Sequence, residues 1–150
     1  MNFIRKLNNK KYLTVIIYIN IIMFIVVNIL ITMYFLFGLT KDIELQKVLL
    51  NNLGVAASLK TLIQKPWTLI THMFTHFNLF HMCFNLCYLY FGGKIFIDYL
   101  SECNLFSTYI MGGLIGFLIY IISLNIFPFF DSINNNTIAL GASSSALAIL

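Results

Sequence analysis

The fold is decided by one uncharged stretch, Tyr12–Phe37, which reads YLTVIIYINIIMFIVVNILITMYFLF. A helix that crosses the hydrocarbon core of a bilayer needs about 20 apolar residues, so this run predicts a membrane span. It is too long for a signal-peptide core and ends without a small-residue cleavage site, so we expect a retained span. The whole chain agrees, because 60% of its 150 residues are hydrophobic, 9% are charged and the mean hydropathy is +0.90. These values are typical of an integral membrane protein and exclude a soluble domain.

The charges around this span predict its orientation. Residues 1–11 carry four basic side chains and no acidic one: Arg5, Lys6, Lys10 and Lys11. Segments rich in lysine and arginine stay on the cytoplasmic side, so we expect a cytoplasmic tail and then a membrane domain over residues 12–150. The formal net charge of +4 is interpreted as a topology signal. It does not indicate nucleic-acid binding, because no soluble face interleaves basic and aromatic residues.

Three more apolar segments follow, over residues 77–97, 105–126 and 138–150. The first two are long enough to be spans, whereas the third is shorter than the about 20 residues that a crossing needs. A carboxylate at Leu150 would lie at membrane depth, so we expect the chain to be the front part of a longer protein. A re-entrant fourth segment is the alternative. The predicted fold class is an all-α, polytopic helical bundle with three full spans and the start of a fourth.

The less apolar stretch over residues 38–66 predicts short amphipathic helices that lie in the membrane interface. Leucines recur every fourth residue up to a glycine that would end the first helix: Leu45, Leu49, Leu53 and Gly54. A second apolar stripe precedes a proline: Leu59, Leu62, Ile63 and Pro66. Trp67 then provides an aromatic anchor at the interface. A loosely ordered loop with incidental leucines is the alternative.

Small residues in the expected spans predict close helix packing. Gly112 and Gly116 have the four-residue spacing that lets helix backbones approach each other. Gly92 and Gly93, near the end of the second span, permit close packing or a bend. The cysteines are expected to be buried free thiols, with no disulfide framework: Cys83, Cys87 and Cys103.

Polar residues in the second and fourth segments point to chemistry. His81 and Asn85 are four residues apart, so they share one helix face near the outer edge of the second span. The predicted topology brings Ser143 to a similar depth on the same side, in the sequence Gly141-Ala142-Ser143-Ser144. Backbone N–H groups at the start of a helix favour developing negative charge, as an oxyanion hole requires. This grouping suggests nucleophilic catalysis within the bilayer.

The same residues also have alternative interpretations, as packing residues or as metal ligands. Asn85 could form an interhelical hydrogen bond that only joins two spans. The small residues around Ser143 could serve tight packing, and the sequence does not separate Ser143 from Ser144 and Ser145 as nucleophile. His72 and His76 have a competent ligand spacing if they lie on a helix, so a metal or haem site with His81 is a further alternative. No carboxylate lies near these histidines, and we expect no metal and no cofactor.

The stretch over residues 67–145 resembles the rhomboid family of intramembrane serine proteases. The matching residues are Trp67, His72, His76, His81, Asn85, Gly92, Gly93, Gly141, Ala142, Ser143 and Ser144. The resemblance implies a bundle of six or more spans that cleaves transmembrane segments of other membrane proteins. It implies Ser143 as the nucleophile, with His81 and Asn85 assisting its backbone N–H in oxyanion binding. It also suggests a bacterial cytoplasmic membrane, with the active site toward the outside.

The chain departs from the family pattern at three points. Ser144 stands where the family usually has the glycine of Gly-x-Ser-Gly, and Trp67-Thr68 stands where it often has Trp-Arg. The family's general base is a histidine on a later span, and no histidine of this chain matches it. We therefore expect residues 1–150 alone to be proteolytically inactive. A non-catalytic relative that binds membrane helices is the alternative function.

Overall fold

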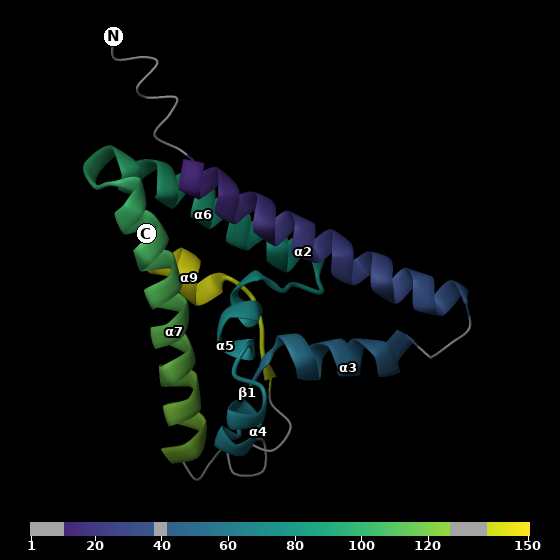
Figure 1. Ribbon diagram of the computed structural model, residues 1–150. Helices are drawn as coiled ribbons and strands as arrows, with labels where there is room; N and C mark the ends of the chain where they lie inside the picture. The colour runs from purple at the N-terminus through teal and green to yellow at the C-terminus, as the bar shows by residue number, and fades with distance from the viewer. Residues whose placement is uncertain (1–10, 38–41, 127–137) are drawn as a thin grey trace.

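The computed structural model describes residues 11–37, 42–126 and 138–150, and these are mostly helical (Figure 1). The elements are α2 (Lys11–Leu36), α3 (Asp42–Leu53), β1 (Val55–Ala56), α4 (Leu59–Gln64), α5 (Thr68–Thr71), η1 (His72–Phe74), α6 (Leu79–Tyr99), α7 (Glu102–Ile126), β2 (Ile138–Ala139) and α9 (Ser143–Leu147). The basic tail up to Lys10 and the polar stretch over residues 131–136 lie outside the described residues.

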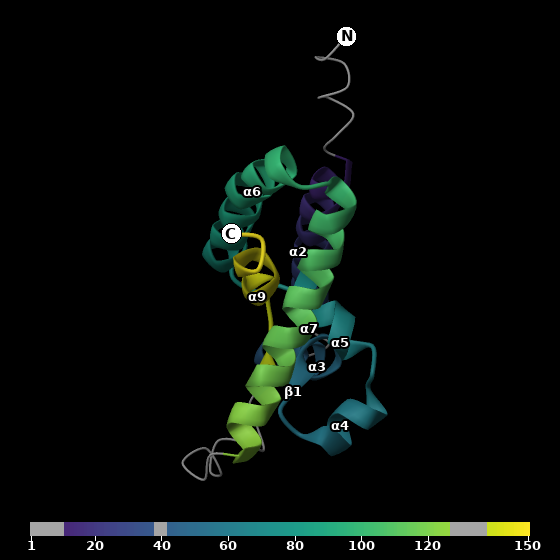
Figure 2. The ribbon, with the colours of Figure 1, turned by 90° about the vertical axis from the view of Figure 1, so that its left-hand side faces the viewer.

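Three long helices form the frame of the molecule. Within the described part of the chain, α2 and α7 are long and apolar enough to cross a membrane. Helix α6 has 21 residues, but its polar side chains lower its hydropathy, and the same criterion of length and apolarity does not mark it as a span. Helix α2 packs against both α6 and α7, and the short α9 lies between α6 and α7 (Figures 1 and 2).

The core lies where α9 meets the long helices. Leu13 and Ile16 from α2 join Leu89 from α6 and Leu105 from α7, and all four are buried. Large apolar side chains are exposed on the outer faces of the same helices: Ile22, Ile29, Phe84, Phe91, Ile115 and Ile119. This arrangement is the one expected of helices whose outer faces contact lipid. Cys83, Cys87 and Cys103 are free, as predicted, but the prediction that they are buried is wrong, because all three are exposed.

The predicted small-residue spacing holds α9 against α7. A Cβ built on Gly112 would collide with Cβ of Ala148 and lie 3.2 Å from the carbonyl oxygen of Ser144. A Cβ built on Gly116 would collide with Cβ of Ser144. Because both obstacles lie at or next to the backbone of α9, the two glycines set how closely the serine-bearing helix approaches.

We expect Gly112→Ala to destabilise the fold by about 1–3 kcal/mol, because overpacking must move α9 away from α7. Gly92→Ala is the matched control, since its Cβ would meet Cδ2 of Leu150 at 3.1 Å, and the side chain of Leu150, which is 65% exposed, has room to move aside. Thermal unfolding in detergent compares the two variants. Equal losses of unfolding temperature would contradict the proposed packing of α9.

The stretch between α2 and α5 contains the two predicted short helices. Helix α3 ends at Leu53, directly before Gly54, and α4 covers the second apolar stripe, so both helices are confirmed. The structure adds a short antiparallel pairing in which Val55 of β1 faces Ala139 of β2. The apolar run suggested one helical segment over residues 138–150, and the structure shows that this prediction is wrong. The partner strand holds residues 138–139 extended, and helix begins only at Ser143.

Candidate functional site

Gly141 makes the turn that leads from β2 into α9. Its φ of +105° lies in the left-handed region that glycine adopts without a steric penalty. Its N–H donates to the carbonyl oxygen of His72 at 2.8 Å. The next N–H, of Ala142, donates to Nε2 of His76 at 3.2 Å. Two histidines of the η1 region thus hold the two residues that precede Ser143.

The hydrogen bonds of His76 determine its tautomer. A backbone N–H only donates, so Nε2 of His76 must accept from Ala142 and cannot carry a proton. The amide nitrogen of Asn85 lies 2.9 Å from the same Nε2 and therefore donates to it. The ring hydrogen is then on Nδ1. Burial, helped by the neighbouring His81, lowers the pKa of His76 to about 4, which keeps the ring neutral.

His81 and Asn85 lie side by side against the Gly141 turn, as their shared helix face requires. A Cβ built on Gly141 would be 2.6 Å from Cε1 of His81 and 3.5 Å from Nδ2 of Asn85. Asn85 is buried, whereas His81 is exposed and its ring lies edge-on to that of His76, with centroids 5.2 Å apart. Asn78 caps α6 by accepting from the backbone N–H of His81 at 3.1 Å. The start of α6 thus directs two polar side chains at the residues before Ser143.

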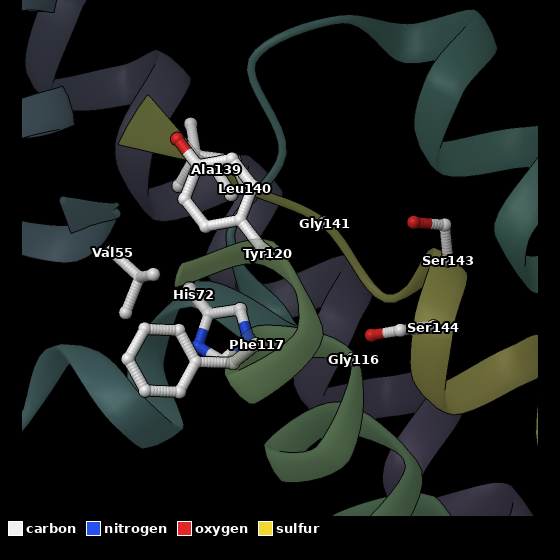
Figure 3. Close-up of a pocket in the computed structure, with 10 residues that line it drawn as sticks. All are labelled: Val55, His72, Gly116, Phe117, Tyr120, Ala139, Leu140, Gly141, Ser143 and Ser144. Atoms are coloured by element: carbon white, nitrogen blue, oxygen red, sulfur yellow. The ribbon is translucent and has the colours of Figure 1, made fainter. Parts of the chain in front are cut away.

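The three consecutive serines have different surroundings. Ser143 is exposed at the first position of α9, and Ser144 packs its Cβ against Gly116. Ser145 is fully buried, and its Oγ has no hydrogen-bond partner among the described residues. Both Ser143 and Ser144 direct their hydroxyls away from α9 toward a cavity (Figure 3). Among the three, Ser143 is the hydroxyl that a substrate can reach most directly.

The cavity beside Ser143 has a volume of about 180 Å³. Its lining comes from α7, η1, the two strands and the α9 turn: Val55, His72, Gly116, Phe117, Tyr120, Ala139, Leu140, Gly141, Ser143 and Ser144 (Figure 3). Nδ1 of His72 lies 2.8 Å from the carbonyl oxygen of Thr68, so this nitrogen carries the ring hydrogen. Sequence reasoning missed Tyr120, although it follows Gly116 by four residues and so shares its helix face.

The histidines do not form a metal site in the part of the chain that the structure describes. No three histidine, cysteine, aspartate or glutamate side chains there are grouped closely enough to hold an ion. Nδ1 of His72 and Nε2 of His76 already have protein partners. Within these residues the metal alternative therefore lacks a grouped set of three ligands.

We expect the protein to lose stability as the pH falls from about 6.5 toward 4, because the unfolded chain binds a proton at His76 more readily than the fold does. Burial also lowers the pKa of His72, which acts in the same direction. Thermal unfolding in detergent at several pH values measures the loss. In His76→Gln, whose side-chain oxygen can still accept from Ala142, the pH dependence should be weaker. An unchanged pH dependence in this variant would contradict the assignment.

Two long apolar helices and a short helix packed beside them define a helical membrane protein. Its polar site is an exposed serine that borders a cavity. A comparison with protein families matches residues 64–150 to the rhomboid domain. This is more than half of the chain, and the chain therefore belongs to the rhomboid family. Members of the family are intramembrane proteases or inactive homologues and act on membrane-protein substrates within the bilayer. Comparisons with curated proteins and with solved structures give no match.

Proposed function

We propose that the protein is an intramembrane serine endopeptidase that cleaves transmembrane segments of other membrane proteins, with Ser143 as its nucleophile. One observation carries this proposal: Ser143 is exposed over a cavity while the turn before it lies against His81 and Asn85. A protein that only binds helices needs neither a hydroxyl at this place nor two hydrogen-bonding side chains beside it.

In the proposed reaction, Oγ of Ser143 attacks the carbonyl carbon of the scissile peptide bond. The hydroxyl proton passes to a base, and the carbonyl oxygen gains negative charge in the tetrahedral intermediate. The backbone N–H of Ser143, in the first turn of α9, has no acceptor within its own helix and can donate to this oxygen. The amine then leaves with a proton, and a water molecule hydrolyses the acyl-enzyme.

His81 and Asn85 are proposed as the other oxyanion donors. The amide nitrogen of Asn85 carries two hydrogens, and one of them is used by Nε2 of His76. The second hydrogen remains for the oxyanion. The ring of His81 borders the same turn and is exposed toward the entering substrate. His76 therefore acts as the acceptor that fixes which end of the Asn85 amide faces the site.

The base is proposed to be a histidine on a later span, as the family resemblance implies. Nε2 of His76 already accepts two hydrogen bonds, and His72, whose Nδ1 donates to Thr68, makes its described side-chain hydrogen bond there and not to Ser143. Among the described residues no hydrogen bond joins Ser143 to a histidine. A serine hydroxyl without an adjacent base is a weak nucleophile.

We therefore expect residues 1–150 alone to be inert, whereas a protein that includes the later spans should react with a fluorophosphonate at Ser143. Mass spectrometry of the labelled peptide locates the adduct, and a transmembrane reporter in liposomes measures cleavage. The Ser143→Ala variant sets the background for both forms. Serine-dependent cleavage by residues 1–150 would show that a histidine of this chain serves as base. No labelling of the longer form would favour the helix-binding alternative.

A further inference from the structure

A buried chain of hydrogen bonds joins α2 and α7 to the segment that carries His72 and His76. Asn20 on α2 and Tyr109 on α7 are both 0% exposed. Nδ2 of Asn20 donates to the carbonyl oxygen of Ile16 at 2.9 Å and to the hydroxyl of Tyr109 at 3.3 Å. The Tyr109 hydroxyl in turn donates to the carbonyl oxygen of Met73 in η1 at 3.1 Å.

Only one arrangement of hydrogens satisfies this chain. The carbonyl oxygen of Ile16 can only accept, so the nitrogen of the Asn20 amide must face it. The second hydrogen of that nitrogen points at the Tyr109 oxygen, which leaves the tyrosine's own hydrogen for Met73. Asn20 therefore orients the Tyr109 hydroxyl, and Tyr109 fixes the backbone of η1.

This series of hydrogen bonds ends at Met73, and that position gives it a role beyond joining two helices. Met73 directly follows His72, whose carbonyl oxygen holds the N–H of Gly141, and precedes His76, whose Nε2 holds that of Ala142. The Tyr109 ring also packs against that of Phe74, with centroids 5.6 Å apart. A shift of η1 would move both acceptors that hold the turn before Ser143.

We propose that Asn20 and Tyr109 are positioning residues, which act through Met73 and η1 to hold the Gly141–Ala142 turn and thereby the Ser143 hydroxyl. The catalytic part of this inference rests on the proposed function. Its structural part concerns the turn alone. Because a misplaced nucleophile slows the chemical step, loss of the Tyr109 hydroxyl should lower kcat and leave KM unchanged.

Site-resolved hydrogen exchange on the chain in nanodiscs tests the structural part. In Tyr109→Phe the amide protons of Gly141 and Ala142 should exchange about three- to tenfold faster, the amount that one hydrogen bond's net stabilisation supports. Asn20→Leu should give the same direction, and the double variant should not exceed Tyr109→Phe, because Asn20 acts through Tyr109.

Two variants serve as matched controls. Asn28→Leu removes an amide from the same helix, where it donates to the carbonyl oxygen of Phe24 at 2.8 Å, the same bond that Asn20 makes to Ile16. Tyr99→Phe removes a hydroxyl from a tyrosine that is 85% exposed. Neither control should change exchange at Gly141 or Ala142.

The outcomes separate this inference from the proposed function, since exchange needs no catalysis. Unchanged exchange at Gly141 and Ala142 in Tyr109→Phe would overturn it, even in an active enzyme. Faster exchange throughout α6 and α7 would also overturn it, because that pattern reports general destabilisation. In the form with the later spans, cleavage of the reporter should show a lower kcat at constant KM. A raised KM at constant kcat would refute the positioning role.

Discussion

Ser143→Ala is expected to abolish cleavage of a transmembrane reporter by a form of the protein that carries the proposed histidine base. The variant removes the atom that forms the covalent bond in the proposed reaction, while Ser143 is exposed and lies outside the buried core cluster. Expression and unfolding temperature should therefore match those of the parent. Reporter cleavage in liposomes and fluorophosphonate labelling measure the loss.

The two neighbouring serines are the matched controls for this result. Ser145→Ala removes a buried oxygen without a partner among the described residues, so stability should be unchanged or slightly higher. Ser144→Ala keeps the Cβ that packs against Gly116 and should keep activity within a few-fold of the parent. If Ser143→Ala cleaved normally while either of these variants did not, the nucleophile assignment would be wrong.

Loss of His81 or Asn85 should slow cleavage less, by about 10- to 1000-fold each, as expected for oxyanion donors.

Much of the fold could be predicted because its elements follow from local patterns. The uncharged run over residues 12–37 gives α2, and the leucine spacing with Gly54 gives α3 and its end. The apolar segments from Phe77 and Leu105 give α6 and α7 to within a few residues. Periodicity and helix-ending residues act between neighbours in the sequence, so no knowledge of distant contacts was needed.

The details of the site depend on contacts between distant residues and could not be predicted in this way. Val55 pairs with Ala139 across more than eighty positions, and this pairing delays the start of α9 to Ser143. The choice among the three serines depends on which one meets Gly113 or Gly116 of α7. Nothing in the local sequence of Tyr109 indicates that its hydroxyl reaches Met73.

Gly141→Ala is the second variant with a large expected effect, because the position combines two demands that an added Cβ cannot meet. A φ of +105° is strained for an alanine, at a cost of about 1–3 kcal/mol. The new Cβ would also lie 2.6 Å from Cε1 and 3.0 Å from Nε2 of His81. The turn must therefore shift, His81 must move, or both. A displacement of about 1 Å at a nucleophile can cost 100-fold in rate, so we expect kcat to fall at least that far.

Gly92→Ala separates this effect from a general intolerance of glycine replacement in the bundle. The Cβ of that variant would meet the side chain of Leu150 at 3.1 Å, and Gly92 has no positive φ, so the rate should stay near that of the parent. Reporter cleavage gives kcat, and thermal unfolding shows whether Gly141→Ala still folds. A folded Gly141→Ala protein with parental kcat would mean that neither the left-handed turn nor the closeness of His81 matters to the reaction. The proposed oxyanion site would then lack its geometric basis, because His81 and Asn85 are assigned to it by their contact with this turn.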